Sequence, residues 1–181
     1  MPGSKTREVT TAALLVASGI VIPIAFHSAG LAGRVFLPMH LPVAMAGLLV
    51  GWRAALAVGA LTPLVSSLLT GMPPLAPMPV ALVMALELSA HAATVSLLHR
   101  RWRLRPPLAI AGGIVAGRIT TGLVYSVLVR AFGFRLDPFA AVAGALLVGW
   151  PGLTVQLTVV PALFEALARR GLDVGVGPGR P

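Results

Sequence analysis

A few ionisable side chains interrupt long apolar stretches, and their spacing suits chemistry. Glu87 and His91 are four residues apart, so on a helix they share one face. Arg118 is followed by Thr121 and Tyr125 at helical spacing, which places these three on one face as well. A carboxylate, an imidazole and a guanidinium can pair with one another, bind a small polar ligand or transfer protons.

Glu87 and Arg118 are expected to lie at similar depths in neighbouring helices. Counted from the predicted outer ends of those helices, Glu87 is about 12 Å deep and Arg118 about 18 Å deep, at 1.5 Å per residue. An arginine side chain can cover that difference. Two interpretations remain open and can both hold: an ion pair that locks the two helices together, and a ligand site that faces a cavity.

Further polar side chains flank or follow apolar runs and are candidate pocket residues. His40 lies at the start of one run, and Arg34 belongs to the loop before it, so both are expected near the mouth of a pocket. Gln156 suits either a pocket or a hydrogen bond between helices. Trp150 suits either an interfacial anchor or a pocket wall. His27, on the other side of the loop, is expected to be a hydrated interfacial histidine.

Several chemistries are excluded or disfavoured by what the sequence lacks. There is no cysteine, which excludes disulfides, thiol nucleophiles and thiolate metal sites. The four histidines lie in separate segments without an H-E-x-x-H pattern, so neither a metal nor another cofactor is predicted. There is no G-x-x-x-x-G-K-[ST] motif, so any ATP hydrolysis must take place in another chain.

The elements that must position these residues are membrane helices. Of the 181 residues, 57% are hydrophobic and 10% are charged, whereas about 25% of a soluble domain is charged. We predict an all-α, polytopic membrane protein: a compact bundle of six transmembrane helices over residues 9–26, 36–52, 54–69, 79–98, 107–131 and 151–168.

The ends of this membrane domain, residues 9–170, are polar or rich in turn residues. Residues 1–8 are predicted to be a cytoplasmic segment, and residues 171–181, rich in Gly and Pro, a disordered cytoplasmic tail. Gly and Pro at 149–152 predict a break in the last apolar stretch. Residues 137–148 are therefore expected to form a short interfacial helix before the sixth transmembrane helix.

The basic residues indicate the orientation of the bundle. The net charge of +9 does not indicate nucleic-acid binding, because the basic residues lie at the ends of apolar runs. With six helices, three of them fall in the outer loops, namely Arg34, Arg130 and Arg135, and Arg118 lies within a helix. Ten share the side of the termini: Lys5, Arg7, Arg53, Arg100, Arg101, Arg103, Arg105, Arg169, Arg170 and Arg180. The positive-inside rule then predicts a plasma-membrane protein with both termini in the cytoplasm.

Several motifs together resemble one family. These are Ala13-x-x-x-Ala17 in the first helix, the stretch at 36–43 that reads F-L-P-M-H-L-P-V, the pair Gly117-Arg118, and the pattern P-G-x-x-x-Q-x-x-x-x-P at 151–161 that follows Trp150. The chain resembles the substrate-binding S components of energy-coupling factor (ECF) vitamin transporters over nearly its whole length. The P-G-x-x-x-Q-x-x-x-x-P pattern is the most specific part of the match.

The resemblance implies a binding subunit and not an enzyme. Such a subunit captures a vitamin or small vitamin precursor from outside, in a pocket near the outer ends of helices 4 to 6, with the first outer loop as its lid. Ala13 and Ala17 would dock on a transmembrane coupling subunit, and two ABC ATPase subunits would drive transport. The ECF module can be dedicated or shared, and the sequence does not distinguish these.

The substrate identity is not readable from the sequence. Arg118, His40 and His91 could pair with a carboxylate, which favours an anionic vitamin such as nicotinate, pantothenate or a folate-type molecule. The alternatives are an intramembrane enzyme that uses Glu87 and His91 as acid and base, and an accessory membrane subunit.

Overall fold

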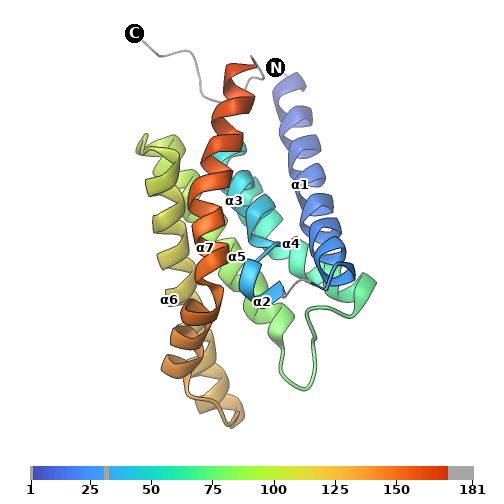
Figure 1. Ribbon diagram of the computed structural model, residues 1–181, viewed down its shortest axis with the longest axis vertical. Coiled ribbons are helices and arrows are strands. Elements are labelled where there is room, and N and C mark those ends of the chain that lie inside the picture. The colour runs from blue at the N-terminus through green and yellow to red at the C-terminus, as the bar shows by residue number, and fades with distance from the viewer. Residues whose placement is uncertain (1, 31–32, 171–181) are drawn as a thin grey trace.

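The computed structural model describes residues 2–30 and 33–170, with the side chains of 5–30 and 35–170, and every regular element in this part of the chain is helical. The helices are α1 (Pro2–Ser28), α2 (Gly33–Phe36), α3 (His40–Leu49), α4 (Trp52–Thr70), α5 (Val80–Ser96), η1 (Leu97–Arg101), α6 (Pro106–Phe132) and α7 (Pro138–Arg169) (Figure 1). Within these bounds the predicted all-α class is confirmed. The predicted tail at 171–181 lies outside the described residues.

Five of the described helical segments are long and apolar enough to cross a membrane: α1, α4, α5 with its π-helical continuation η1, α6 and α7. The segment predicted at 36–52 contains α3, which has 10 residues and spans about 15 Å, half of a ~30 Å hydrocarbon core. The chain nevertheless returns to the level of the start of α1, because the Gly51 N–H donates to Glu8 Oε1 at 2.7 Å. A sixth crossing therefore stays a prediction.

The last apolar stretch differs from the expectation. Residues 138–169 form one helix of 32 residues, so the short interfacial helix at 137–148 is not confirmed. Asp137 begins α7 as an N-cap, accepting from the Phe139 and Ala140 N–H groups at 2.8 and 3.2 Å. Pro151 lies inside the helix, which membrane helices tolerate because neighbouring groups can satisfy the freed carbonyl. At about 48 Å, α7 exceeds the thickness of the membrane core, and the α6–α7 hairpin reaches furthest from the termini (Figure 1).

The core of the bundle forms around α3 and α5. Eight of the ten residues of α3 are buried, and α5 packs against α3, α4 and α6. Gly113 and Gly117 of α6 are buried against α5: a Cβ built on Gly117 would lie 3.3 Å from Glu87 Cγ, and one on Gly113 would lie 2.9 Å from the His91 carbonyl oxygen. The absence of side chains at these two positions, which are four residues apart, thus allows α5 and α6 to approach closely.

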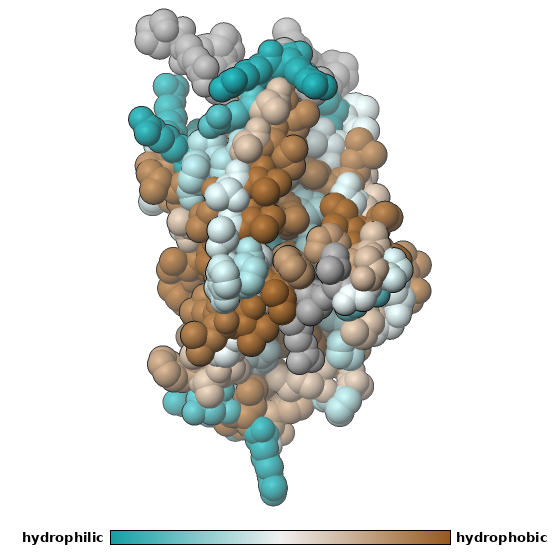
Figure 2. Space-filling model, in the orientation of Figure 1, coloured by the Kyte–Doolittle hydropathy of each residue, from teal (hydrophilic) through white to brown (hydrophobic). Residues whose placement is uncertain are grey.

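One end of the bundle gathers the basic segments. Besides the contact between Glu8 and Gly51, the Arg100 guanidinium donates to the Leu49 carbonyl oxygen at 3.2 Å. The first turn of α1, the turn between α3 and α4, and η1 therefore lie at the same end, where α7 also finishes (Figure 1). Figure 2 shows hydrophilic side chains at the two ends of the molecule and a broad hydrophobic belt between them, as a membrane protein requires.

Candidate functional site

A cavity of about 360 Å³ lies towards the end of the bundle opposite to Glu8. Its walls come from far apart in the sequence: the last turns of α1, the segment between α2 and α3, the end of α4 with its following loop, and parts of α5, α6 and α7. The polar side chains in the wall are His27, His40, Ser66, Thr70, Glu87, Arg118, Thr121 and Tyr125. Most of the remaining lining is apolar, which is the usual composition of a pocket for a small molecule.

The structure brings Glu87 and Arg118 together at this cavity. Arg118 Nη1 lies 2.9 Å from Glu87 Oε1, and their side chains are 11% and 9% exposed. Gly117, next to Arg118, has no side chain that would hold α6 away from Glu87. The depth argument from the sequence thus placed the two charges correctly relative to each other, and the ion pair links α5 to α6.

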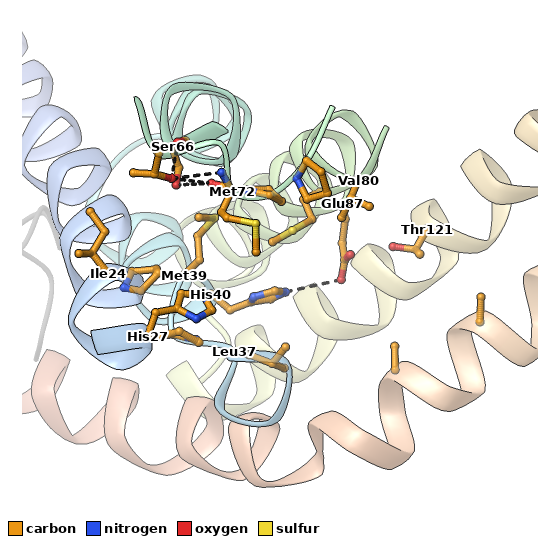
Figure 3. A pocket seen from close by; sticks show the side chains of 18 of the residues that line it. Ile24, His27, Leu37, Met39, His40, Ser66, Met72, Val80, Glu87 and Thr121 are labelled. Carbon is orange, nitrogen blue, oxygen red and sulfur yellow. Dashed lines mark hydrogen bonds and ion pairs between the residues drawn. The ribbon is translucent and has the colours of Figure 1, made fainter. Parts of the chain in front are cut away.

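His40 extends this charged pair from a third helix. Its Nε2 atom lies 3.6 Å from Glu87 Oε1, which is an ion-pair distance only if the imidazole is protonated. In Figure 3 the ring points from the start of α3 towards the carboxylate. Both ring nitrogens are buried and have no hydrogen-bond partner among the described residues. His40 therefore presents unused hydrogen-bonding capacity beside the cavity.

His91 does not reach the cavity, although it shares a helix face with Glu87. It is 2% exposed, and its ring packs edge-on against the His40 ring with centroids 6.3 Å apart. The cavity lining includes Glu87 and His40 but not His91. His91 therefore packs against the His40 ring outside the cavity. This position does not favour Glu87 and His91 as an acid–base pair that acts on a substrate.

The structure places the other predicted site residues in different surroundings. Thr121 and Tyr125 line the cavity from α6, as their spacing from Arg118 predicted. Gln156 is fully buried outside the lining, and its amide has no partner among the described residues. Trp150 is 64% exposed on the outside of α7, which suits an interfacial anchor. Arg34 belongs to α2, but its side chain lies outside those described.

The sequence interpretation missed the wall formed by α4 and the loop after it. Ser66 donates to the Met72 carbonyl oxygen at 2.7 Å, and the Met72 N–H donates to the Thr70 hydroxyl at 3.2 Å. These bonds fold the loop back over the helix end. Met72, Pro73 and Pro74 line the cavity as a result. The available signal was the i, i+4 spacing of Ser66 and Thr70 at the end of a mostly apolar helix.

The wall between α2 and α3 is held in a strained conformation. Leu37 has a φ of 49°, which is uncommon for a residue with a side chain and costs about 1–3 kcal/mol. The preceding α2 sits against α7, because a Cβ built on Gly152 would lie only 2.6 Å from the Phe36 carbonyl carbon and oxygen. Because Gly152 has no side chain, the backbone of α2 can pack directly against α7, and this contact positions the wall between α2 and α3 at the cavity.

The site offers binding chemistry more readily than catalysis. Within the described residues, no three His, Cys, Asp or Glu side chains are grouped as metal ligands. The polar groups are a paired carboxylate and guanidinium, an imidazole and hydroxyls, set in apolar walls. Such a set can orient a small molecule through hydrogen bonds while the apolar walls enclose it.

A comparison with protein families gives one match. Residues 7–164 match the family described as ECF transporter, substrate-specific component. No curated protein and no solved structure matches the chain significantly. The match covers α2 to α6 and most of α1 and α7, so it includes every residue that lines the cavity.

Proposed function

The chain belongs to the family of substrate-specific components of ECF transporters, and on that premise we propose that it captures a vitamin or small vitamin precursor from outside the cell in the cavity beside Glu87 and Arg118. Membership makes it a multi-pass membrane protein of a transport system. The observation that carries the proposal is the cavity of about 360 Å³ with a buried polar cluster in an apolar wall.

Native mass spectrometry of the purified full-length chain tests this proposal. A small molecule that stays bound through purification is expected, since the pocket encloses its ligand on several sides. Titration of the chain with a panel of vitamins and precursors gives a second measurement. A chain that carries no small molecule and binds none of the panel would contradict a capture function.

The proposed orientation places the cavity outside the cell. The loop at 71–79 lies at the cavity end, and Lys5 lies at the basic end. Because the chain has no cysteine, Lys5→Cys and Leu75→Cys each introduce a single reactive site without background. A membrane-impermeant maleimide should label Leu75→Cys in intact cells and Lys5→Cys only after permeabilisation. Labelling of both from outside would overturn the topology, and the cysteine-free chain is the control.

The proposed partners are a transmembrane coupling subunit and two ABC ATPase subunits. On α1, Ala12, Leu15 and Val16 pack against the core, while Ala13 and Ala17 are exposed. The latter two are four residues apart, and their small side chains form an exposed strip on which another helix could pack closely. The exposure of this strip supports Ala13 and Ala17 as the docking face.

Ala13→Trp should therefore prevent co-purification with the coupling subunit, because the indole fills the strip. Ligand binding by the isolated chain should not change, since the cavity does not include Ala13. Ala162→Trp, an exposed alanine on α7, is the matched control and should leave the complex intact. Normal transport by Ala13→Trp would show that this strip is not the docking face.

A further inference from the structure

The charges that line the cavity already balance each other. The lining contains one acidic and one basic side chain, Glu87 and Arg118, besides two histidines. The acid and the base are in direct contact at 2.9 Å and are almost fully buried. Any ligand that enters this site therefore meets an acidic and a basic side chain that already neutralise each other.

His40 adds a further hydrogen-bonding position beside the ion pair. Neither ring nitrogen makes a hydrogen bond in the described part of the chain, but Nε2 lies 3.6 Å from Glu87 Oε1, so Nδ1 is the nitrogen without a facing group. The residue is 5% exposed, and buried polar groups are nearly always paired in native proteins. A bound molecule that hydrogen-bonds to Nδ1 as well as to the ion pair would complete the site.

The ion pair also offers a ligand both hydrogen-bond donors and hydrogen-bond acceptors. A guanidinium carries five N–H donors, of which the contact with Glu87 uses one, and an ionised carboxylate accepts at about four lone-pair positions. In Figure 3 the Glu87 carboxylate lies between the His40 ring and the Thr121 side chain. Donors from Arg118 and acceptors from Glu87 are thus presented side by side.

We propose that the cavity selects an electrically neutral molecule that carries a hydrogen-bond donor and an acceptor next to each other, as an amide or a lactam edge does. The acceptor of the ligand faces Arg118 and its donor faces Glu87, with His40 completing the set. This inference rests on the proposed capture function and names the ligand class for the same site. It replaces the expectation of an anionic vitamin, because the charge of Arg118 is already taken up by Glu87 and His91 lies behind His40.

The physical reason is the cost of an uncompensated charge in a dehydrated site within a membrane. An anion placed against Arg118 would also lie beside the Glu87 carboxylate, and like charges at short range repel strongly where little water screens them. A neutral donor–acceptor edge gains hydrogen bonds to both charged groups without adding net charge. The cavity volume of about 360 Å³ is near the lower end of ligand pockets, which run from about 300 to 1,000 Å³, and so favours a small molecule.

Matched pairs of probes test this inference on the purified full-length chain. Nicotinamide and nicotinate share one ring, panthenol and pantothenate share one amide-containing chain, and within each pair one member is neutral and the other an anion. Isothermal titration should show that, in a pair that binds, the neutral member binds at least about tenfold more tightly. Glu87→Gln keeps the shape but leaves Arg118 uncompensated, so it should reverse the preference. Glu165→Gln, an exposed carboxylate on α7 outside the cavity, should keep the wild-type preference.

Each other outcome has a definite meaning. Tighter or equal binding of the anion, or anion binding with uptake of a proton seen as a buffer-dependent heat, overturns the neutral class but leaves the capture function standing. If no pair binds, the molecule found by native mass spectrometry decides: a neutral one with an amide-like edge supports the inference, and any other overturns it. A chain that retains no molecule and binds no probe contradicts the capture function, and the inference falls with it.

Discussion

Arg118→Met is expected to lower the free energy of unfolding by about 3–5 kcal/mol, the usual effect of removing one partner of a buried ion pair. The substitution leaves the Glu87 carboxylate, 9% exposed, without its guanidinium partner and with only the His40 ring, at 3.6 Å, beside it. The measurement is unfolding of the full-length chain in detergent, by thermal melts and by denaturant where unfolding is reversible. Arg130→Met, at an exposed position on the same helix, should change stability by less than about 0.5 kcal/mol.

The double variant separates the two interpretations of the pair. Glu87→Gln/Arg118→Met removes both charges together, so it should recover most of the lost stability. If the pair also holds the ligand, the double variant should fold and yet fail to bind. A double variant that folds and binds with wild-type affinity would make the pair purely structural. Wild-type stability of Arg118→Met alone would show that Glu87 does not depend on Arg118.

Gly152→Ala and Gly144→Ala are expected to have effects of opposite sign, although both place a methyl group on α7. A Cβ at Gly152 would lie 2.6 Å from the Phe36 carbonyl group and 2.8 Å from the Val35 carbonyl oxygen. These are backbone atoms that can yield only if α2 moves, and overpacking of this kind costs about 1–3 kcal/mol. A Cβ at Gly144 meets nothing within 4 Å, so the better helix propensity of alanine should stabilise α7 by up to about 1 kcal/mol.

The same substitution at Gly152 should also weaken ligand binding. Residues 37–40 follow Phe36 directly and line the cavity, so displacement of α2 from α7 moves this wall and His40 with it. Thermal melts and ligand titration of the two variants, measured side by side, check both effects. Equal melting temperatures and equal affinities for the two variants would mean that the position of α2 does not depend on its close contact with Gly152.

The membrane class and the long helices could be predicted from the sequence because apolar runs in a bilayer have few structural options. Every backbone N–H and C=O must be satisfied without water, so such a run becomes a helix. The spacing of the ionisable residues along those helices then predicted that Arg118, Thr121 and Tyr125 share a face, and the structure places all three at one cavity. The similar depths of Glu87 and Arg118 allowed an ion pair as one of two open interpretations, and the structure places the two side chains in contact.

The direction in which each helix faces could not be predicted with the same success. In a soluble helix the polar face identifies the outside, but a membrane helix is apolar on the side that faces lipid and on the side that faces the core. For this reason His91, Gln156 and Trp150 were each compatible with a pocket in the sequence. In the structure His91 and Gln156 are buried away from the cavity, and Trp150 lies on the outer surface. The hydrogen bonds of Ser66 and Thr70 with the Met72 backbone, which hold one wall of the cavity, depend on how the chain folds back after α4.

The lengths of the helices were likewise predicted only in part from the sequence. Pro and Gly at 149–152 predicted a break because they disfavour helices in water, yet α7 continues through them, since packing against α2 and α6 stabilises the helix there. Conversely, α3 has only 10 residues although the segment predicted at 36–52 is apolar apart from His40, because residues 37–39 lie in a turn before the helix begins. The sequence thus determined that the chain forms membrane helices and which charges lie at similar depth, whereas contacts between helices determined where those helices end and which side chains line the cavity.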